Sequence, residues 1–572
     1  MNSPAIKFTK FGFRYRTQKN PTLYDINLEI QSGEKILITG PSGSGKSTLG
    51  SCLNGLIPFN YPGEVTGELL IGARKPESIF KLSETVGTVL QDTDAQFVGL
   101  TSGEDIAFAL ENRNVAQESM KQRVIEAAKM VGAENYLTRS PFNLSGGQKQ
   151  RVGMAGVMVG NAPVLLFDEP LAALDPLTGK TAVALIDDIS KQTGATIIII
   201  EHRFEDVLYR HIDRVILMND GRIIAVMPPG EMVCSGLLEE CGVREPLYFT
   251  ALKYAGVKIT PDKCPGRLDT LILEESDKAR VREYASTPGL LQTTLDETPL
   301  LEVKNLSFAY EKGQAVLSDV NIKLAQGEMT AIIGANGAGK SSFAKILVGF
   351  EKESDGSIIY NGKDFTDKTI PERAEKIGYI MQNPNQMLCK PMVYDEVALG
   401  LRARGVSESN TRKRVEKTLE ICGLSRFLSW PVSALSYGQK KRVTIADALI
   451  LEPEILIMDE PTAGQDWRNY TRILDFLKEL NTERGITVLM ITHDMHLCLE
   501  YARRALVFAG GRLLCDAPPA DALSDPNITI HANLKETSLF DLAQLAGCTD
   551  KTTLTRVFIR EKRRNHDSIR VH

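Results

Sequence analysis

The sequence predicts an α/β protein in which one domain plan occurs twice. Short apolar runs, such as residues 164–167 and 197–200, have the length and composition of buried parallel strands. Segments of helical periodicity, such as 120–131 and 412–422, lie between such runs. A glycine-rich sequence follows an early apolar run in each half, and later landmarks of the first half return in the second. These observations predict two domains, each with a mostly parallel sheet and a helical subdomain.

Composition and charge are those of an ordinary globular protein. The 572 residues are 43% hydrophobic and 24% charged, and the length suits several domains. The net charge of −5, from 67 basic and 72 acidic residues, creates no general field for nucleic acid, and we expect no nucleic-acid partner. Nine cysteines lie far apart without a CxxC pair, which argues against a zinc site or a disulfide framework and favours a reducing cytoplasm.

Membrane-spanning segments are not expected. No apolar run approaches the ~18 residues that a spanning helix needs, and the first residues show no apolar signal segment. We therefore expect that the chain does not cross a membrane itself, which still allows it to dock on a protein that does.

The repeat extends along almost the whole chain. The tail segment 247–256 resembles 539–547, so each half is expected to end in its own small helical tail. Four landmarks and three positions of the tails recur at a spacing of 291 residues: Gln91 and Gln382, Leu144 and Leu435, Asp168 and Asp459, His202 and His493, Phe249 and Phe540, Ala255 and Ala546, Gly256 and Gly547.

The repeat sets the expected domain boundaries. Between the halves, a segment rich in acidic residues, proline and threonine reads as an exposed linker. The expected division is domain 1 at 1–265 (core 5–230, helical tail 231–265), a linker at 266–299, and domain 2 at 300–572 (core 300–521, helical tail 522–572).

The two glycine-rich loops have the pattern GxxxxGKS between a strand and a helix. Glycines let successive backbone N–H groups point at phosphates, and the helix that follows directs its positive end at the same anion. Lys46 and Lys340 would supply a cation for the β- and γ-phosphates of ATP, and Ser47 and Ser341 a hydroxyl for Mg²⁺. The predicted ATP-binding residues of the loops are Gly40, Pro41, Ser42, Gly43, Ser44, Gly45, Lys46, Ser47 and Thr48, and Gly334, Ala335, Asn336, Gly337, Ala338, Gly339, Lys340, Ser341 and Ser342.

An apolar strand in each half ends in two adjacent acids. Unpaired buried charge is costly, so carboxylates at the end of a buried strand either emerge at the surface or have a function. We expect Asp168 and Asp459 to act on Mg²⁺, mainly through water. Glu169 and Glu460 would then orient and polarise the attacking water as general bases.

A further motif occurs as Leu-Ser-Gly-Gly-Gln at 144–148 and as Leu-Ser-Tyr-Gly-Gln at 435–439. A serine and a glycine N–H at a helix start form a second phosphate cradle. With these motifs the chain resembles the ATP-binding cassette (ABC) ATPases over nearly all of both halves, since LSGGQ is that family's signature. The resemblance implies two P-loop ABC nucleotide-binding domains in one chain, in which each signature completes the ATP site of the opposite half. The signature residues are Ser145, Gly146, Gly147 and Gln148, and Ser436, Gly438 and Gln439.

Tyr437 replaces the first glycine of the second signature. Because the serine, the second glycine and the glutamine remain, we expect this cradle to work.

The resemblance implies roles for four further residues. Tyr15 and Tyr310 lie where the family stacks an aromatic ring on adenine. Gln91 and Gln382 match the Q-loop glutamines, which contact Mg²⁺ or the attacking water and report to a transmembrane partner. The predicted Mg²⁺ set is Ser47, Gln91, Asp168, Ser341, Gln382 and Asp459.

Two more pairs complete the family's pattern. Asp175 and Asp466 match the D-loop, which communicates across the dimer, and His202 and His493 match the switch histidine on the γ-phosphate. Some tandem members have one eroded site. Here both histidines and both catalytic glutamates are present, so two competent sites are expected.

Three local features are similar to the energy-coupling factor (ECF) group and its cobalt and nickel relatives. The first is the sequence after each Q-loop glutamine. The second is the sequence around the histidine of the first half and after the signature of the second half. The third is the helical tail of each half. The first half departs from the group's Q-N-P-D pattern because it lacks the proline.

The resemblance implies an ATPase that is the energy-coupling subunit of a membrane transporter, with ATP and Mg²⁺ as cofactors. An ECF-type importer would carry a vitamin, a vitamin precursor or a metal ion. A transmembrane scaffold subunit and a substrate-binding membrane subunit would be separate chains, and this chain would lie at the cytoplasmic face of the cell membrane.

A soluble tandem-cassette translation factor acting on ribosomes is the alternative. Such factors have a long, charged linker that reaches into RNA, whereas the segment between the halves here is short of lysine and arginine. The basic run 560–564 reads as a solvated tail, which would also suit a position near anionic lipid. A DNA-repair cassette ATPase fits less well, since the chain has neither a coiled-coil insert nor zinc motifs.

Overall fold

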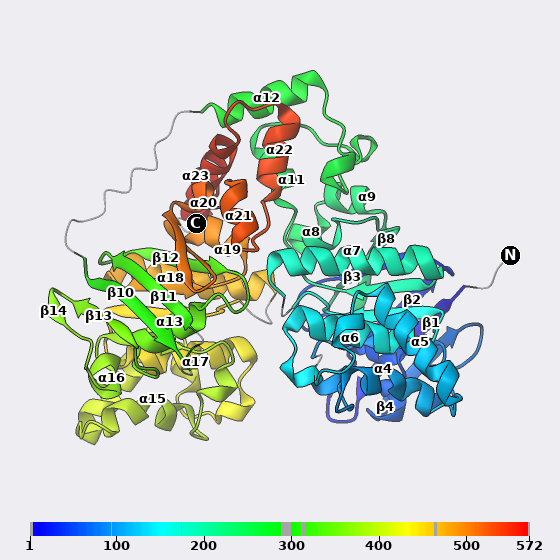
Figure 1. Cartoon of the computed structure of the whole chain (residues 1–572), viewed down its shortest axis with the longest axis horizontal. Helices are drawn as coiled ribbons and strands as arrows, with labels where there is room; N and C mark the ends of the chain where they lie inside the picture. The colour runs from blue at the N-terminus through cyan, green and yellow to red at the C-terminus, as the bar shows by residue number, and fades with distance from the viewer. Residues whose placement is uncertain are drawn as a thin grey trace. The chain divides into compact units, whose positions relative to one another are not determined.

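The computed structural model describes residues 4–92, 94–172, 174–287, 299–310, 313, 315–462 and 466–569. The chain divides into two compact units, Met1–Lys278 and Ala279–His572, and each has its own sheets and its own hydrophobic core (Figure 1).

Unit 1 begins with an antiparallel sheet in the order β2-β1-β4. Its central strand pairs with both neighbours, so that Ile6 lies opposite Ile30 and Ile71. These three isoleucines are buried and belong to the core of the unit, as expected for the covered face of a half-exposed antiparallel sheet. The strands are β1 (Ile6–Tyr15), β2 (Leu23–Ile30) and β4 (Gly63–Ile71).

The second sheet of unit 1 has the order β5-β6-β7-β3-β8-β9, and only the β8–β9 pair is antiparallel. Every residue of β3 and β7 is buried, which explains why these strands are continuous apolar runs. The carboxyl ends of β3, β6 and β7 lie at one edge, where parallel sheets bind ligands. The strands are β3 (Lys35–Thr39), β5 (Val86–Val89), β6 (Val164–Asp168), β7 (Thr196–Ile200), β8 (Arg214–Asn219) and β9 (Arg222–Met227).

The helices of unit 1 include the helix after the glycine loop, a helical subdomain and a tail. Helix α1 follows the glycine loop, α4, α5 and α6 pack on one another as the helical subdomain, and α9 to α11 form the tail (Figure 1). Their bounds are α1 (Lys46–Leu53), α2 (Leu56–Phe59), α3 (Ile79–Leu82), α4 (Ser102–Glu111), α5 (Gln117–Met130), α6 (Gly146–Met158), α7 (Pro176–Thr193), α8 (Phe204–Val207), α9 (Pro229–Cys234), α10 (Leu237–Glu240) and α11 (Leu247–Tyr254).

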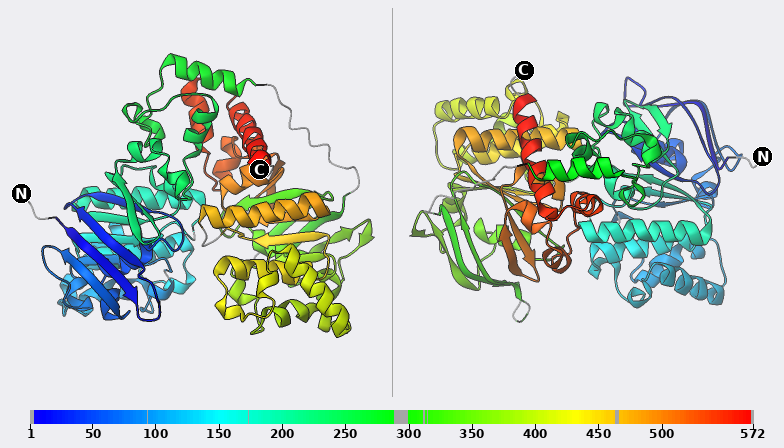
Figure 2. Two further views of the ribbon diagram at one scale, coloured as in Figure 1. Left: turned by 180° about the vertical axis from the view of Figure 1, so that it is seen from behind. Right: turned by 90° about the horizontal axis from the view of Figure 1, so that it is seen from above.

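Unit 2 repeats this plan with sheets in the orders β11-β10-β13-β14 and β15-β16-β17-β12-β18-β19. Helix α18 packs against β17 of the six-stranded sheet (Figure 2). The strands are β10 (Leu301–Ala309), β11 (Ala315–Leu324), β12 (Met329–Gly334), β13 (Asp355–Tyr360), β14 (Lys363–Asp364), β15 (Ile377–Ile380), β16 (Ile455–Asp459), β17 (Thr487–Ile491), β18 (Arg504–Ala509) and β19 (Arg512–Ala517).

The helices of unit 2 follow the same order as those of unit 1. They are α13 (Lys340–Leu347), α14 (Ile370–Ala374), α15 (Val393–Arg402), α16 (Glu408–Ile421), α17 (Tyr437–Leu449), α18 (Trp467–Arg484), α19 (Met495–Tyr501), α20 (Pro519–Ala522), α21 (Pro526–His531), α22 (Ser538–Ala546) and α23 (Lys551–Ile569). Two units with parallel α/β sheets and helical subdomains confirm the predicted fold class.

The described part of the expected linker, residues 266–287, is more ordered than its polar composition indicates. It contains helix α12 (Glu275–Ala285) and four buried apolar residues, Leu271, Leu273, Val281 and Ala285. The apolar run Leu271-Ile272-Leu273 is short and the rest of the segment is mostly polar, so the sequence shows no sustained hydrophobic period here. The two units divide within this segment, and residues 288–298 lie outside the described part of the chain.

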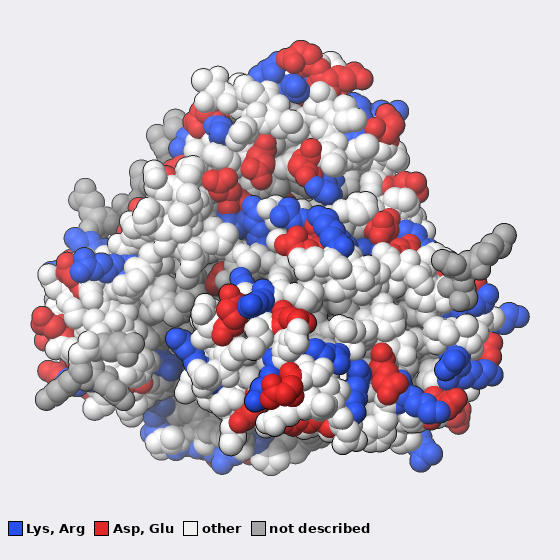
Figure 3. Space-filling view, turned by 45° about the vertical axis from the view of Figure 1, so that its right-hand side comes forward, with Lys and Arg blue, Asp and Glu red and all other residues white. Residues whose placement is uncertain are grey.

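None of the helices that the structure describes has both the length and the hydrophobicity needed to cross a membrane. On the face drawn in Figure 3, acidic and basic side chains are interspersed.

Candidate functional site

Each glycine-rich loop joins a buried strand to a helix, β3 to α1 and β12 to α13, as predicted. Gly45 and Gly339 precede the helices with φ of 98°, a left-handed value that favours glycine. A Cβ on Gly40 would lie 2.1 Å from the carbonyl oxygen of Met218. At these positions the loop backbone therefore excludes a side chain.

The two loop lysines bind their own loops. Lys46 is buried, and its Nζ donates to the carbonyl oxygens of Gly40 and Pro41 at 2.8 Å each. Lys340 makes the same two bonds to the first residues of its loop, at 2.9 and 2.7 Å. The ammonium groups are thus fixed beside the loops, where a phosphate anion would form charge-assisted hydrogen bonds with them.

The glutamates predicted to be general bases occupy a strained position at the strand ends. Glu169 and Glu460 have φ of 47° and 46°, values that a non-glycine residue rarely adopts. Their amides donate to Ile200 at the end of β7 and to Ile491 at the end of β17, at 2.8 and 2.9 Å. The same strain at the same place in both units is typical of a functional site.

Predicted site residues that lie far apart in the sequence contact these glutamates. In unit 1, His202 Nε2 lies 2.8 Å from one carboxylate oxygen of Glu169, and Gln91 Nε2 donates to the other at 2.5 Å. In unit 2, His493 Nε2 lies 3.1 Å from Glu460. The structure therefore brings together the predicted general base and switch histidine in each half.

The electrostatics of the two acid pairs differ. Burial raises the pKa of Asp168 to about 6, and the neighbouring carboxylates of Glu169 and Glu201 add to this. Burial would also raise the pKa of Glu169, but the hydrogen bond from His202 and nearby cations outweigh it and leave that pKa below its usual value. Burial raises the pKa of Glu460 to about 8. The pKa values of the two equivalent glutamates are therefore shifted in opposite directions.

The residues predicted to hold Mg²⁺ offer suitable oxygens. Asp168 Oδ1 is buried and has no hydrogen-bond partner among the described residues. In unit 2, Ser341 Oγ lies 3.5 Å from Asp459 Oδ1, and the Tyr379 hydroxyl donates to Asp459 Oδ2 at 3.1 Å. Hydroxyl and carboxylate oxygens are the hard ligands that Mg²⁺ prefers, so this set of residues fits the ion.

Both signature motifs start a helix. Ser145 caps α6 by accepting from the Gln148 amide at 3.4 Å, and Gln148 accepts from the Ser145 amide at 3.0 Å. Ser436 and Gln439 make the same reciprocal bonds at the start of α17, at 3.3 and 2.8 Å. The glutamines thus help to cap helices whose N-termini are suited to bind phosphate.

The predicted adenine-stacking tyrosines lie beside the glycine loops. The Tyr15 hydroxyl is 3.3 Å from Thr48 Oγ1, and the Tyr310 hydroxyl is 3.2 Å from Ser342 Oγ. Each ring packs edge-on against a phenylalanine two residues earlier, with centroids 4.8 Å apart. Stacking on adenine stays a prediction.

The D-loop aspartates cap the helices that follow them. Asp175 accepts from the Thr178 amide at 2.9 Å, and Asp466 accepts from the Asn469 amide at 2.7 Å. Ala173 and residues 463–465, just before these caps, lie outside the described residues. Communication through this segment stays a prediction.

Sequence reasoning assigned no role to Glu201, which fixes the turn at His202. Its buried carboxylate accepts from the amides of Leu171, His202 and Arg203, at 3.1, 2.8 and 3.1 Å. The signal in the sequence that could have identified Glu201 is its position directly before the predicted switch histidine. Two residues of α17, Tyr437 and Lys441, also contact the Q-loop without having been assigned a structural role.

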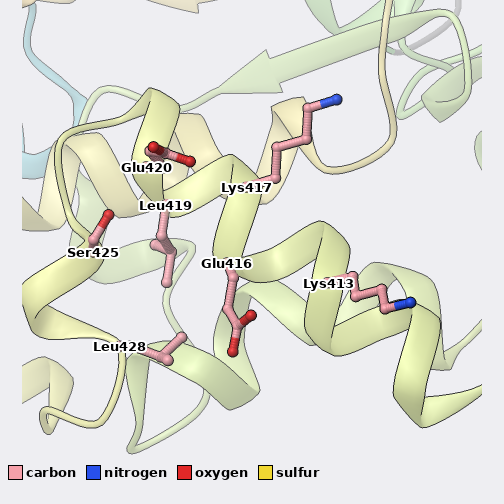
Figure 4. Close-up of a pocket in the computed structure, with 7 residues that line it drawn as sticks. All are labelled: Lys413, Glu416, Lys417, Leu419, Glu420, Ser425 and Leu428. Carbon is pink, nitrogen blue, oxygen red and sulfur yellow. The ribbon is translucent and has the colours of Figure 1, made fainter.

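A surface hollow beside α16 contains none of the predicted site residues. Figure 4 shows its lining from α16 and the segment after it, with the lysine side chains directed outward. The lining residues are Lys413, Glu416, Lys417, Leu419, Glu420, Ser425 and Leu428. Most are charged, and nothing in the hollow indicates a catalytic role.

Comparison with known families agrees with this geometry. Residues 23–172 and 317–463 match the family described as ABC transporter, and residues 235–308 match the family described as ATP-binding cassette cobalt transporter. The chain belongs to the ABC transporter ATP-binding proteins and carries two such domains in tandem. It is accordingly an ATP-binding subunit with ATPase activity.

Close relatives share this organisation over their whole length. A protein of Clostridium perfringens, described as an ABC transporter ATP-binding protein, is 52% identical to this chain. The match covers 94% of this chain and 95% of the relative. A relative in Vibrio parahaemolyticus is 52% identical over 97% of this chain and 96% of its own length. A relative in Lactiplantibacillus plantarum is 48% identical over 98% of this chain and 100% of its own length. The solved structure of cbiO1 from Clostridium perfringens, part of the ABC transporter complex cbiONQ, is 34% identical. It covers 44% of this chain and 98% of its own, with a TM-score of 0.39.

Proposed function

We propose that this chain is the energy-coupling subunit of an ECF-type importer. The match of residues 235–308 to a family described by cobalt transport is the observation that supports it most, because this segment lies outside the two stretches that match the ABC transporter family. Two complete sets of catalytic side chains support a machine in which both halves hydrolyse ATP.

The proposed ATP sites use residues that the structure brings together within each unit. Lys46 and Lys340 would bind the β- and γ-phosphates, while Glu169 and Glu460 would accept a proton from the attacking water. The switch histidines hold these carboxylates in place by direct contact. When bound, Mg²⁺ supplies positive charge that offsets the charge of the phosphates.

The signatures would complete these sites from the opposite half. ATP at the Lys46 loop would be capped by Ser436 and Gly438, and ATP at the Lys340 loop by the serine and second glycine of the first signature. Binding would then close the halves, and hydrolysis would open them.

The proposed partners are a transmembrane scaffold subunit and a substrate-binding membrane subunit, both separate chains. Such partners place the chain at the cytoplasmic face of the cell membrane. The cobalt description of the matched family favours a metal ion as cargo, with a vitamin or vitamin precursor as the other candidate classes. In this proposal the cargo is selected by the membrane subunit, so this chain carries no residues that choose it.

Co-purification tests this proposal directly. An affinity-tagged full-length chain is purified from detergent-solubilised membranes and, separately, from the ribosomal pellet. We expect membrane subunits in the first preparation and ATP hydrolysis that depends on Mg²⁺. Sedimentation with ribosomes without membrane association would instead favour a translation factor.

A further inference from the structure

The signature helix of unit 2 is attached to the Q-loop that follows β15. The Tyr437 hydroxyl donates to the carbonyl oxygen of Gln382 at 3.3 Å. One turn further along α17, Lys441 Nζ donates to the carbonyl oxygens of Met381 and Gln382, at 2.8 and 2.9 Å. Two side chains from one helix thus hold the backbone of the Q-loop glutamine.

The burial of Lys441 makes this attachment firm. The residue is only 1% exposed, and a buried ammonium must be surrounded by acceptors. The two Q-loop carbonyls supply them. Displacing the Q-loop from α17 would leave the ammonium without these two acceptors, so loop and helix move together.

In the described residues of unit 1, the matching positions make none of these three bonds. Gly146 replaces the tyrosine and has no side chain, and Gln150 replaces the lysine. The Gln150 amide donates to the Pro170 carbonyl oxygen at 2.6 Å, in the segment after β6 rather than in the Q-loop. Within the described residues of unit 1, no α6 side chain is bonded to the carbonyl oxygen of Gln91.

Both units share a weaker link, which serves as an internal comparison. Lys149 pairs with Asp94 at 2.6 Å, and Lys440 donates to Asn385 at 3.0 Å. These side chains lie at or near the surface, where such contacts contribute little. The additional attachment is therefore specific to unit 2.

We propose that Tyr437 and Lys441 are positioning residues that couple the signature helix of unit 2 to Gln382. In this inference, which rests on the proposed function for the roles of the two motifs, a shift of the Q-loop is transmitted to Ser436 and Gly438. Unit 1 transmits such shifts less directly, so the two signatures respond unequally to nucleotide.

The test uses a swap that gives unit 2 the residues of unit 1. In the full-length chain, Tyr437→Gly and Lys441→Gln are combined, since unit 1 folds with this pair. Gln150→Ala in unit 1 is the matched control, and Tyr437→Phe isolates the hydroxyl. Peptide-level hydrogen exchange is measured over 381–388 and 90–97, and kcat and KM for ATP are determined.

The swap should speed exchange over 381–388 about tenfold and leave 90–97 unchanged, because the three hydrogen bonds that hold the loop backbone are lost. KM should stay within about twofold while kcat falls about fivefold, as expected for lost positioning rather than lost binding. Unchanged exchange over 381–388, or an equal response to Gln150→Ala, would overturn the inference. If the unmodified chain hydrolyses no ATP, the proposed function fails, while the exchange measurement still decides whether the attachment exists.

Discussion

At the scale of single residues, the two glutamates predicted to be general bases combine strained backbone with converging side chains. Glu169 receives His202 and Gln91 on its two carboxylate oxygens, whereas Glu460 has a longer contact with His493. Identical residue types thus have different electrostatics in the two halves, because burial and hydrogen bonding act on them to different extents.

The glutamates give the first prediction at this scale. Glu169→Gln and Glu460→Gln should each retain ATP binding, because the amide keeps the shape of the side chain. Turnover should fall by about 10² or more, since the amide cannot accept the proton of the attacking water. Nucleotide binding and phosphate release are the two measurements. Unchanged hydrolysis in the double variant would refute the assignment.

At the scale of elements, a buried ion pair joins strand β3 to helix α7 in unit 1. Lys35 and Asp187 form it, and both are almost completely buried. Lys191 reaches the other carboxylate oxygen at 2.7 Å. Unit 2 has Met329 at the start of the equivalent strand, five residues before its glycine loop, so the same fold also accepts an apolar residue there.

Breaking this pair from one side should destabilise unit 1. Asp187→Asn leaves the ammonium of Lys35 buried without its counter-charge, which should lower the free energy of unfolding by about 3 kcal/mol. Adding Lys35→Met should recover part of the loss, because methionine is the residue that unit 2 carries. Urea unfolding of the three variants measures both effects, and equal stability of the single variant and the parent would contradict the role of the pair.

The same carboxylate predicts a pH dependence. Burial alone would raise the pKa of Asp187, but the hydrogen bonds from Lys191 and Lys35 outweigh it and lower that pKa. A lowered folded pKa contributes stability above the unfolded value of about 3.9, and this contribution is lost as pH falls through the folded value. The stability gap between the parent and Asp187→Asn should therefore be full at pH 7 and close in strong acid. A gap that persists unchanged there would contradict this linkage.

At the scale of the whole molecule, each unit ends in a helical tail packed on its own core. In unit 2, Leu554 and Phe558 of α23 are fully buried, and Arg563 donates to the carbonyl oxygen of Ala502 at 2.5 Å. The tail is therefore part of the folded unit and not an appendage.

We predict that the tails help to hold the two halves together. Deletion of residues 534–572 should weaken nucleotide-driven closure and assembly with membrane partners, as measured by cross-linking between the halves and by co-purification. Because this deletion also removes core side chains, thermal unfolding of unit 2 is the control. Intact closure and assembly after the deletion would show that the idea is wrong.

The sequence by itself determined the duplication and the parallel α/β fold, and it predicted the pairs of catalytic residues, because glycine loops and acid-ending strands require particular residues at fixed spacings. The tertiary structure alone decided the order within α12, the buried carboxylate of Glu201 and the attachment of Lys441 to the Q-loop. Each of these depends on contacts between segments far apart in the chain. Hydrogen bonds and cations around Glu169, which no residue pattern records, also decided that its pKa differs from that of the buried Glu460.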